Sequence, residues 1–265
     1  MLFKKDIRSG GRSVIKEKIR MYLTVIKREN RENYRKIKAY KDMYKDHRCW
    51  IIGNGPSLVS EDLDQIKGEF SFAANKIYYI FSKTLWRPSV YMCQDPRVIQ
   101  SILNDKTPEK YFINESNIFI SKVLKNSAER IFEDPAYYRL CKGKGLKDIS
   151  FSNDFPVYVV EGLSVTYSMI QLAVYMGFKE INLLGIDHNQ NTVNKDNADK
   201  MHFDTRYKND LTSYPSDMEY GYLTKCFERS RIECEKKGIH IYNATRGGNL
   251  HVFERKSLEQ LLGES

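Results

Sequence analysis

The sequence predicts an α/β fold in which a mostly parallel sheet carries helices on both faces, preceded by a long basic amphipathic helix. Two observations predict the sheet: apolar runs of strand length alternate with helical segments from residue 48 onward, and polar residues directly follow several of these runs. A third observation separates the leading helix, because residues 1–48 hold 16 Lys and Arg against 6 Asp and Glu, whereas the rest holds 27 against 28. We therefore divide the chain into a basic amphipathic segment, 1–47, and an α/β body, 48–265.

Composition narrows the class of protein. With 265 residues and 41% hydrophobic content, the chain suffices for one α/β domain with an appendage. No apolar run approaches the roughly 20 residues of a membrane-spanning helix, and the N terminus lacks the apolar region of a signal peptide. The five cysteines are scattered and form no C-x-x-C pair, which argues against a zinc site and for a reducing compartment. These features predict a cytoplasmic protein.

The basic segment has the pattern of one long helix. From residue 12 to residue 48 there is no Gly or Pro, and apolar residues recur mostly three or four positions apart. They are Ile15, Ile19, Tyr22, Ile26, Tyr34, Ile37, Tyr40 and Tyr44. Three uses fit such a helix: binding to an anionic membrane surface, packing on the domain or on a second subunit of a homo-oligomer, and binding nucleic acid. The Ile and Tyr stripe favours the first two, and we expect no nucleic-acid partner.

The body opens on the stretch Trp50-Ile-Ile-Gly-Asn-Gly-Pro-Ser-Leu58, which reads as a buried strand, a turn and a helix start near Ser60. In an open α/β sheet such a loop lies at the carboxyl edge, where ligands bind. Gly53 and Gly55 would let the backbone approach a ligand closely, and free N–H groups there would meet phosphate. The loop is neither G-x-G-x-x-G nor a P-loop, because no Lys-Ser/Thr follows the glycines. An ordinary strand-to-helix turn is the alternative.

The remaining elements follow in order. Strands are expected at 70–74, 89–93, within 111–120, and at 157–160, 180–184 and 239–242. Helices are expected at 77–81, from Ser164 to a C-cap at Gly177, at about 217–237 and at 257–262. Residues 125–155 have weak periodicity and predict an insertion or lid, and the polar loop from 189 to about 215 is too long for a simple connection.

Polar residues cluster where these strands end. They are Asn54 and Ser57, Asn75, Asp95, Asp187 and His188, and Asn243. One polar residue after a strand is uninformative, but polar residues after five strands predict one ligand crevice at the carboxyl edge of the sheet.

Several blocks carry a resemblance to known enzymes. The segment 51–58, Asn75 and the block SVTYSMIQLAVYMGFKEINLLGID at 164–187 resemble the bacterial sialyltransferases of glycosyltransferase family 42. The segments FAANKIY at 72–78, His202-Phe203 and IYNATRGG at 241–248 look like the wider group of Maf-type flagellin glycosyltransferases and MptE-like 6-hydroxymethylpterin diphosphokinases. The resemblance covers about residues 48–255 in blocks and implies a Rossmann-like fold, a variant of the GT-A type. It leaves sugar transfer and pyrophosphate transfer both open.

The resemblance implies a donor site. The loop of Gly53, Asn54, Gly55, Pro56 and Ser57, together with Asn75, would hold the nucleotide of a CMP-sugar. Ser164 and Thr166, at a helix start, would lie near the phosphate and the sugar.

The chain departs from the sialyltransferase pattern at two places. Gln94-Asp95 replaces a polar Asn, and His188-Asn-Gln190 replaces the tyrosines expected after G-I-D. The resemblance to the sialyltransferases implies no metal, but Asp95 and Asp187 could hold the Mg²⁺ that a diphosphokinase needs.

Sugar transfer requires a base, and His suits this role because its pKa lies near working pH. We predict His202 as the base, with His188 next, while a surface-loop histidine is the alternative for His202. Arg206 and Tyr207 would meet the oxygens of the departing phosphate.

Two enzyme classes and one non-enzymatic class follow. The first is a glycosyltransferase that transfers a CMP-activated, sialic-acid-like sugar to a glycan or glycolipid acceptor at the inner face of the cell membrane. The second is an MptE-like diphosphokinase using ATP and Mg²⁺, and the third is a nucleotide-binding scaffold. The basic segment favours the first, because lipid-linked acceptors lie at an anionic surface whereas pterins are free in solution.

Overall fold

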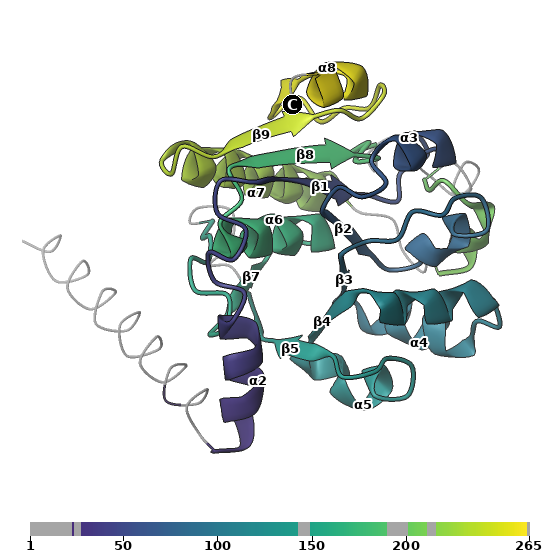
Figure 1. The fold of residues 1–265 in the computed structure, drawn as a ribbon, viewed down its shortest axis with the longest axis vertical. Coiled ribbons are helices and arrows are strands. Elements are labelled where there is room, and N and C mark those ends of the chain that lie inside the picture. Colours follow the sequence, from purple (N-terminus) through teal and green to yellow (C-terminus); the bar gives the residue numbers. More distant parts are fainter. Residues whose placement is uncertain (1–22, 24–27, 143–148, 190–200, 211–215, 264–265) are drawn as a thin grey trace, which may run out of the picture.

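The computed structural model describes residue 23 and residues 28–142, 149–189, 201–210 and 216–263. Figure 1 shows a twisted eight-stranded sheet with helices on both faces, which confirms the predicted α/β class. Its strands lie in the order β10-β9-β8-β1-β2-β3-β4-β5, and every pair is parallel. Their bounds are β1 Arg48–Ile52, β2 Ser71–Ala74, β3 Val90–Cys93, β4 Asn117–Ser121, β5 Ala136–Tyr138, β8 Glu180–Leu184, β9 His240–Asn243 and β10 Glu254–Arg255.

The strand order creates a topological switch point. From β1 the chain adds strands outward through β2 to β5, and then it returns to place β8 on the other side of β1. Loops that leave β1 and β8 therefore diverge, and in open α/β sheets the crevice between such loops is where ligands bind. A second, two-stranded sheet pairs β6 Leu140–Lys142 with β7 Val159–Glu161.

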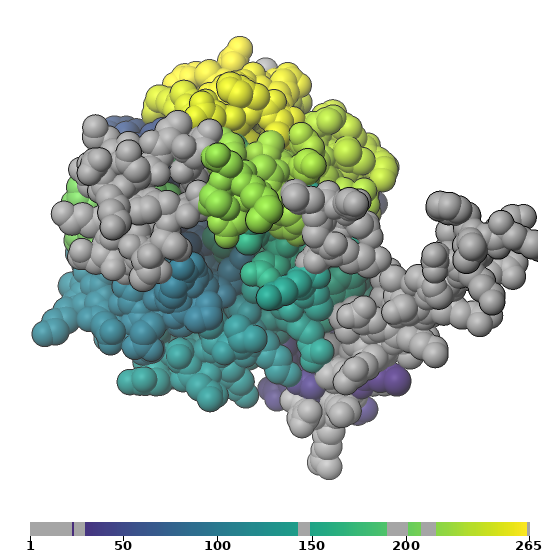
Figure 2. Space-filling model, turned by 180° about the vertical axis from the view of Figure 1, so that it is seen from behind, coloured from purple at the N-terminus to yellow at the C-terminus, as the bar shows by residue number. Residues whose placement is uncertain are grey.

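Helices divide between the two faces. The α-helices are α2 Arg28–Lys38, α3 Ser60–Gln65, α4 Pro96–Asn104, α5 Lys125–Ala128, α6 Val165–Met176, α7 Asp217–Glu235 and α8 Leu258–Gly263. The 3-10 helices are η1 Ile77–Ile80, η2 Pro108–Glu115, η3 Lys122–Leu124 and η6 Thr205–Asp210. Helices α6 and α7 cover one face, and α3 and α4 cover the other (Figure 1). Seen from behind, α8 forms one end of the molecule and α2 lies toward the opposite end (Figure 2).

Each face has its own core, because successive strand residues point to opposite sides. In β1, Cys49 and Ile51 pack with α6 and α7, whereas Trp50 and Ile52 pack with the helices of the other face. All four side chains are buried completely. This double burial explains why β1 reads as a continuous apolar run.

Helix α6 is the central support of the site, and ten of its twelve residues are buried. Its N-cap Ser164 accepts a hydrogen bond from the Thr166 N–H at 3.2 Å, and its C-cap Gly177 takes a φ of 94°. The turn at 39–46 satisfies the last carbonyls of α6, since the N–H groups of Asp42 and Tyr44 donate to Tyr175 and Met176 at 3.1 and 2.9 Å. This turn therefore belongs to the packed domain.

The leading helix differs from the prediction. We expected a helix over 12–48, but in the described residues α2 ends at Lys38 and a turn leads into β1. Ile37 is completely buried, and the amide of Asn33 exchanges two 2.7 Å hydrogen bonds with the backbone of Tyr137 in β5. Residues 28–46 thus pack on the body instead of standing apart, and residues 1–27, apart from residue 23, lie outside the described residues.

The expected lid at 125–155 is a second correction. This segment contributes α5, the sheet-edge strand β5, and β6. Strands of three residues are too short to show periodicity, so the sequence pattern could not reveal them. The prediction also lacked α4, although its start signal was present: Asp95 is the N-cap and Pro96 follows at the first helical position.

Candidate active site

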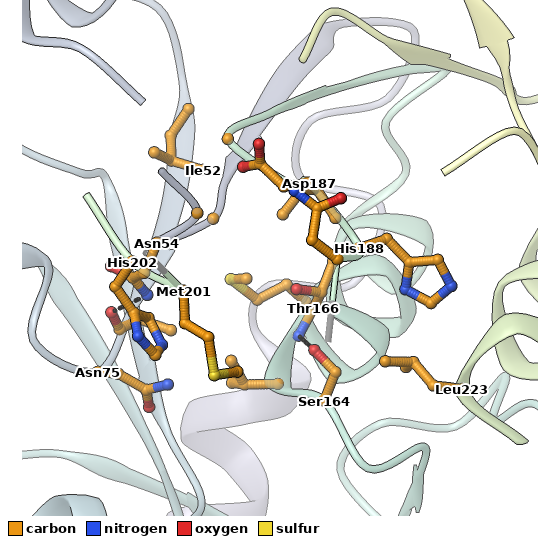
Figure 3. A pocket seen from close by; sticks show the side chains of 18 of the residues that line it. Ile52, Asn54, Asn75, Ser164, Thr166, Asp187, His188, Met201, His202 and Leu223 are labelled. Atoms are coloured by element: carbon orange, nitrogen blue, oxygen red, sulfur yellow. Dashed lines mark hydrogen bonds between the residues drawn. The ribbon is translucent and has the colours of Figure 1, made fainter. Parts of the chain in front are cut away.

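A cavity of about 150 Å³ lies at the switch point, at the carboxyl ends of β1, β2 and β8 and over the start of α6. Figure 3 shows it from close by. Polar lining residues are Asn54, Asn75, Ser164, Thr166, Asp187, His188, Asn189 and His202. Apolar lining residues include Met169, Met201, Leu223 and Phe227, which sequence reasoning did not select because apolar residues give no site-specific signal. Three of the five predicted strand ends thus meet at one cavity.

The glycines of the β1 loop line the cavity, as predicted, and they also let this loop pack closely against the β8 loop. A Cβ on Gly53 would lie 2.2 Å from the carbonyl oxygen of Gly185, and a Cβ on Gly55 would lie 1.8 Å from Oδ2 of Asp187. Both distances are shorter than any real contact of a Cβ atom. The space that the glycines leave is therefore filled by the β8 loop, and the glycines are required for the two loops to pack.

Three N–H groups of this loop donate hydrogen bonds within the protein. Gly53 donates to Leu184 at 2.8 Å, and Gly55 donates to Gly185 at 2.9 Å. Ser57 donates its hydroxyl to Asp187 at 2.8 Å, and its N–H donates to the same carboxylate at 3.4 Å. These three N–H groups are therefore not free to meet a phosphate. Pro56 and Ser57 also do not line the cavity.

Two amide side chains present unused acceptors instead. Asn54 donates its Nδ2 to the carbonyl of Ala74 at 3.1 Å, which fixes the amide. In the part of the chain that the structure describes, Oδ1 of Asn54 and Oδ1 of Asn75 are buried without a hydrogen-bond partner. Because an unpaired buried acceptor is costly, these oxygens mark a place for ligand donors. Hydroxyl and amino groups of a nucleoside are such donors, and phosphate oxygens are not.

The start of α6 faces the same cavity. Ser164 and Thr166 line it, and a helix N-terminus favours a negatively charged group. Leu163, which precedes the N-cap, holds a φ of 61° with half of its surface exposed. Positive φ is uncommon for a bulky residue and marks a strained connection at the cavity rim.

His202 lies beside Asn54 and Asn75 (Figure 3). The N–H of the next residue, Phe203, donates to the carbonyl of Asn54 at 3.1 Å, which pins this segment to the β1 loop. The imidazole stacks on the ring of Tyr207 with 4.3 Å between centroids and an interplanar angle of 8°. His202 is therefore placed in the cavity and is not a free surface-loop residue.

His188 lies on the other side, and its ring points away from Asn75 and His202 (Figure 3). Its Nε2 lies 2.9 Å from the hydroxyl of Thr224, and its ring stacks on Tyr220 at 4.2 Å. Burial lowers the pKa of His188 to about 4. A histidine held this way is a weak base, and it joins the β8 loop to α7.

The other polar residues predicted at this edge of the sheet make their contacts outside the cavity. Arg206 pairs with Asp204 at 2.8 Å, and Tyr207 is buried beneath His202; neither residue lines the cavity. Asn243, the last residue of β9, is buried; its side chain donates to the carbonyl of Leu250 and accepts from the N–H of Thr245.

The predicted carboxylate pair does not meet in the cavity. Asp95 caps α4 and pairs with Arg97 at 2.8 Å; burial alone would raise the pKa of Asp95, but the hydrogen bonds and charge of Arg97 outweigh burial and lower it. Asp187 lines the cavity, and burial raises its pKa, opposed by the hydrogen bonds from Ser57. Asp95 does not line the cavity, so the two carboxylates are not arranged around one ion. Within the described ranges, no group of three or more His, Cys, Asp or Glu could hold a metal.

Fold and site together define a Rossmann-like α/β protein with a polar ligand cavity at its switch point. The chain belongs to the MptE-like family: the family model described as "6-hydroxymethylpterin diphosphokinase MptE-like" matches residues 26–192. No curated protein sequence matches the chain.

Two solved structures are similar in fold. The Maf glycosyltransferase from Magnetospirillum magneticum AMB-1 aligns with a TM-score of 0.52 and 17% identity, over 86% of this chain and 38% of that protein. The present chain thus spans well under half of that neighbour's length. The sialyltransferase CstII from Campylobacter jejuni, in complex with cytidine-5'-monophosphate, aligns with a TM-score of 0.47 and 21% identity, over 80% of this chain and 85% of that one.

Proposed function

We propose that this protein is a glycosyltransferase that binds a CMP-activated acidic sugar in the cavity and transfers the sugar to a glycan or glycolipid acceptor. The observation that carries the proposal is the pair of buried, unpartnered amide oxygens on Asn54 and Asn75, opposite the start of α6. The two oxygens suit the hydroxyl and amino donors of a nucleoside. The helix start suits one phosphate.

The charge of the cavity supports a donor with few phosphates. Among the described residues, none that lines the cavity is Lys or Arg. A triphosphate is normally held by a Lys and by Mg²⁺, whereas the single phosphate of a CMP-sugar requires less positive charge. The similarity of the 51–58 loop to the sialyltransferase loop points to the same donor.

The chemistry requires one proton transfer. The acceptor hydroxyl oxygen bonds to the anomeric carbon as the bond from that carbon to the phosphate oxygen breaks, and CMP leaves with the bonding electrons. His202 takes the hydroxyl proton. His188 is less suited, because its pKa is lowered to about 4 and its Nε2 is engaged by Thr224.

Pyrophosphoryl transfer to a pterin, with ATP and Mg²⁺, is the second candidate function, and the family description favours it.

We also propose that the enzyme is cytoplasmic and peripheral at the inner face of the cell membrane, where the basic segment 1–47 contacts anionic lipid. In the described part of the chain, no helix is both long enough and apolar enough to cross a membrane.

Calorimetric titration of CMP and ATP, each with Mg²⁺ and with EDTA, tests the donor. We expect CMP to bind without Mg²⁺ and ATP to bind more weakly. Replacing Asn75 with Ala should weaken CMP binding by about 1–3 kcal/mol, the cost of an unmet polar partner. Asn104→Ala, at the exposed end of α4, is the matched control and should bind CMP as the wild type does. Tight, Mg²⁺-dependent ATP binding without CMP binding would favour the diphosphokinase.

A further inference from the structure

A stack of side chains lies behind His202, on the side away from the cavity. The ring of Tyr207 is parallel to the imidazole, with centroids 4.3 Å apart. Tyr79 meets the Tyr207 ring edge-on, at 5.6 Å and 88°. The ammonium of Lys76 lies 5.4 Å from the Tyr79 ring centre and 6.0 Å from that of Tyr207. We refer to Tyr207, Tyr79 and Lys76 as the His202 support.

The support is buried and lies outside the cavity. Lys76 is 3% exposed, and Tyr79 and Tyr207 are each 5% exposed. None of the three lines the cavity, so none is placed to contact the donor. Burying an ammonium group is costly unless other groups stabilise it, and aromatic faces within about 6 Å contribute to that stabilisation.

The outer end of the support is fixed as well. The hydroxyl of Tyr79 donates to Asp105, which also accepts the hydroxyl of Tyr78 at 2.7 Å. The guanidinium of Arg206 covers the Tyr79 ring at 3.9 Å, and Asp204 holds that guanidinium. Tyr79 therefore has little freedom to rotate, and it can hold Tyr207 in place.

We propose that Tyr207, Tyr79 and Lys76 are positioning residues, which fix the plane of the His202 imidazole relative to the acceptor hydroxyl. A general base acts efficiently only when its nitrogen is held within hydrogen-bond reach of the proton it removes. A displacement of about 1 Å can cost roughly 10²-fold in rate. The kinetic test of this inference rests on the proposed function, whereas the spectroscopic test does not depend on it.

Donor turnover is measured first in the wild type, Tyr207→Leu, Tyr207→Phe and Lys76→Met. Tyr207→Leu removes the ring and should lower kcat about 10- to 100-fold, with KM for the donor and CMP affinity unchanged. Tyr207→Phe keeps the stacked ring and should retain kcat within about threefold. Lys76→Met keeps the apolar stem without the charge and should lower kcat by an intermediate factor.

A double-mutant cycle separates positioning from general damage to the fold. His202→Ala should lower kcat by about 10²-fold or more. If Tyr207 acts through His202, the His202→Ala/Tyr207→Leu double variant should be no slower than His202→Ala alone. Additive losses would overturn the proposal.

Histidine-ring NMR tests the support without any donor. The His202 ring signal is assigned by its absence in His202→Ala, and the other four histidines serve as internal references. Tyr207→Leu and Lys76→Met should shift or broaden the His202 signal while the signals of the other histidines stay in place. An unchanged His202 signal in both variants would overturn the inference. If the two variants show this NMR response but the wild type transfers no CMP-sugar, the proposed function is rejected and the role of the support stands.

Discussion

Three non-glycine residues beside the cavity hold left-handed backbone conformations: Asn75, Leu163 and His188, with φ of 59°, 61° and 54°. Asn and His adopt this region more often than other residues, whereas the bulky Leu adopts it at a cost. Asn75 and His188 follow β2 and β8 of the main sheet, and Leu163 connects β7 of the second sheet to α6. Strain of this kind persists where the surrounding structure fixes it, and such sites are frequently functional.

His188 should make stability depend on pH. Its pKa is about 4 in the folded protein against a usual value near 6.5, so between these values the unfolded chain binds more protons. The contribution of the neutral His188 ring to the free energy of unfolding is therefore fully present above about pH 6.5 and is lost as the pH falls toward 4. His188→Asn, which tolerates the same φ, should show a shallower fall in thermal midpoint between pH 6.5 and 4. Equal slopes for the two proteins would contradict the assignment.

At the scale of elements, the β1 and β8 loops act as one unit. The carbonyl of Gly185 and the carboxylate of Asp187 occupy the space beside Gly53 and Gly55, and Ser57 closes the contact. The motif G-N-G-P-S thus specifies a loop–loop interface that orients Asn54 toward the cavity.

Substituting two glycines tests this interface. Gly55→Ala should destabilise the protein by about 1–3 kcal/mol, because its Cβ meets Asp187 and the Gly185 carbonyl. Gly221→Ala, in the middle of α7 with no atom near its Cβ, should stabilise by about 0.5–1 kcal/mol. Denaturant unfolding measures both changes, and a neutral Gly55→Ala would mean that the two loops separate easily.

At the scale of the whole molecule, the C-terminal part of the basic segment belongs to the packed body. Residues 28–46 pack on the body through Ile37, Asn33 and the carbonyls at the end of α6. Residues 1–27 carry 8 Lys and Arg against 2 Asp and Glu. Each basic residue near an anionic surface contributes about 1 kcal/mol to membrane binding, falling with salt.

Two truncations separate these roles. Deleting residues 1–27, which hold 8 Lys and Arg, should reduce binding to anionic vesicles at low salt. Deleting residues 1–46 should lower the midpoint by several degrees, because it exposes the surface that Ile37 covers, worth about 1.5–3 kcal/mol for that side chain alone. Equal vesicle binding by the full chain and the shorter truncation would argue against the membrane role.

The sequence by itself determined the fold class and indicated a polar crevice at the carboxyl edge of the sheet, whereas the strand order that makes this place a switch point came from the structure. Buried parallel strands appear in the sequence as apolar runs, and the residues that follow parallel strands lie at the carboxyl edge of the sheet. This rule groups Asn54, Asn75 and Asp187, which do meet at the cavity, but it also groups Asp95 and Asn243 with them, and those two residues do not line it. It failed for the three-residue strand β5, which carries too few residues for a period to emerge.

Only the tertiary structure decided what each polar group is bonded to. The sequence offers both His202 and His188 as candidate bases, with His202 preferred. The fold bonds His188 to Thr224 and stacks it on Tyr220, and it stacks His202 on Tyr207 at the cavity. In the same way, the carboxylate of Asp95 caps α4 by accepting a hydrogen bond from the N–H of Arg97. The physical reason is that burial and partners are set by residues far apart in the chain, such as Lys76 and Tyr207, whose contact leaves no periodic trace in the sequence.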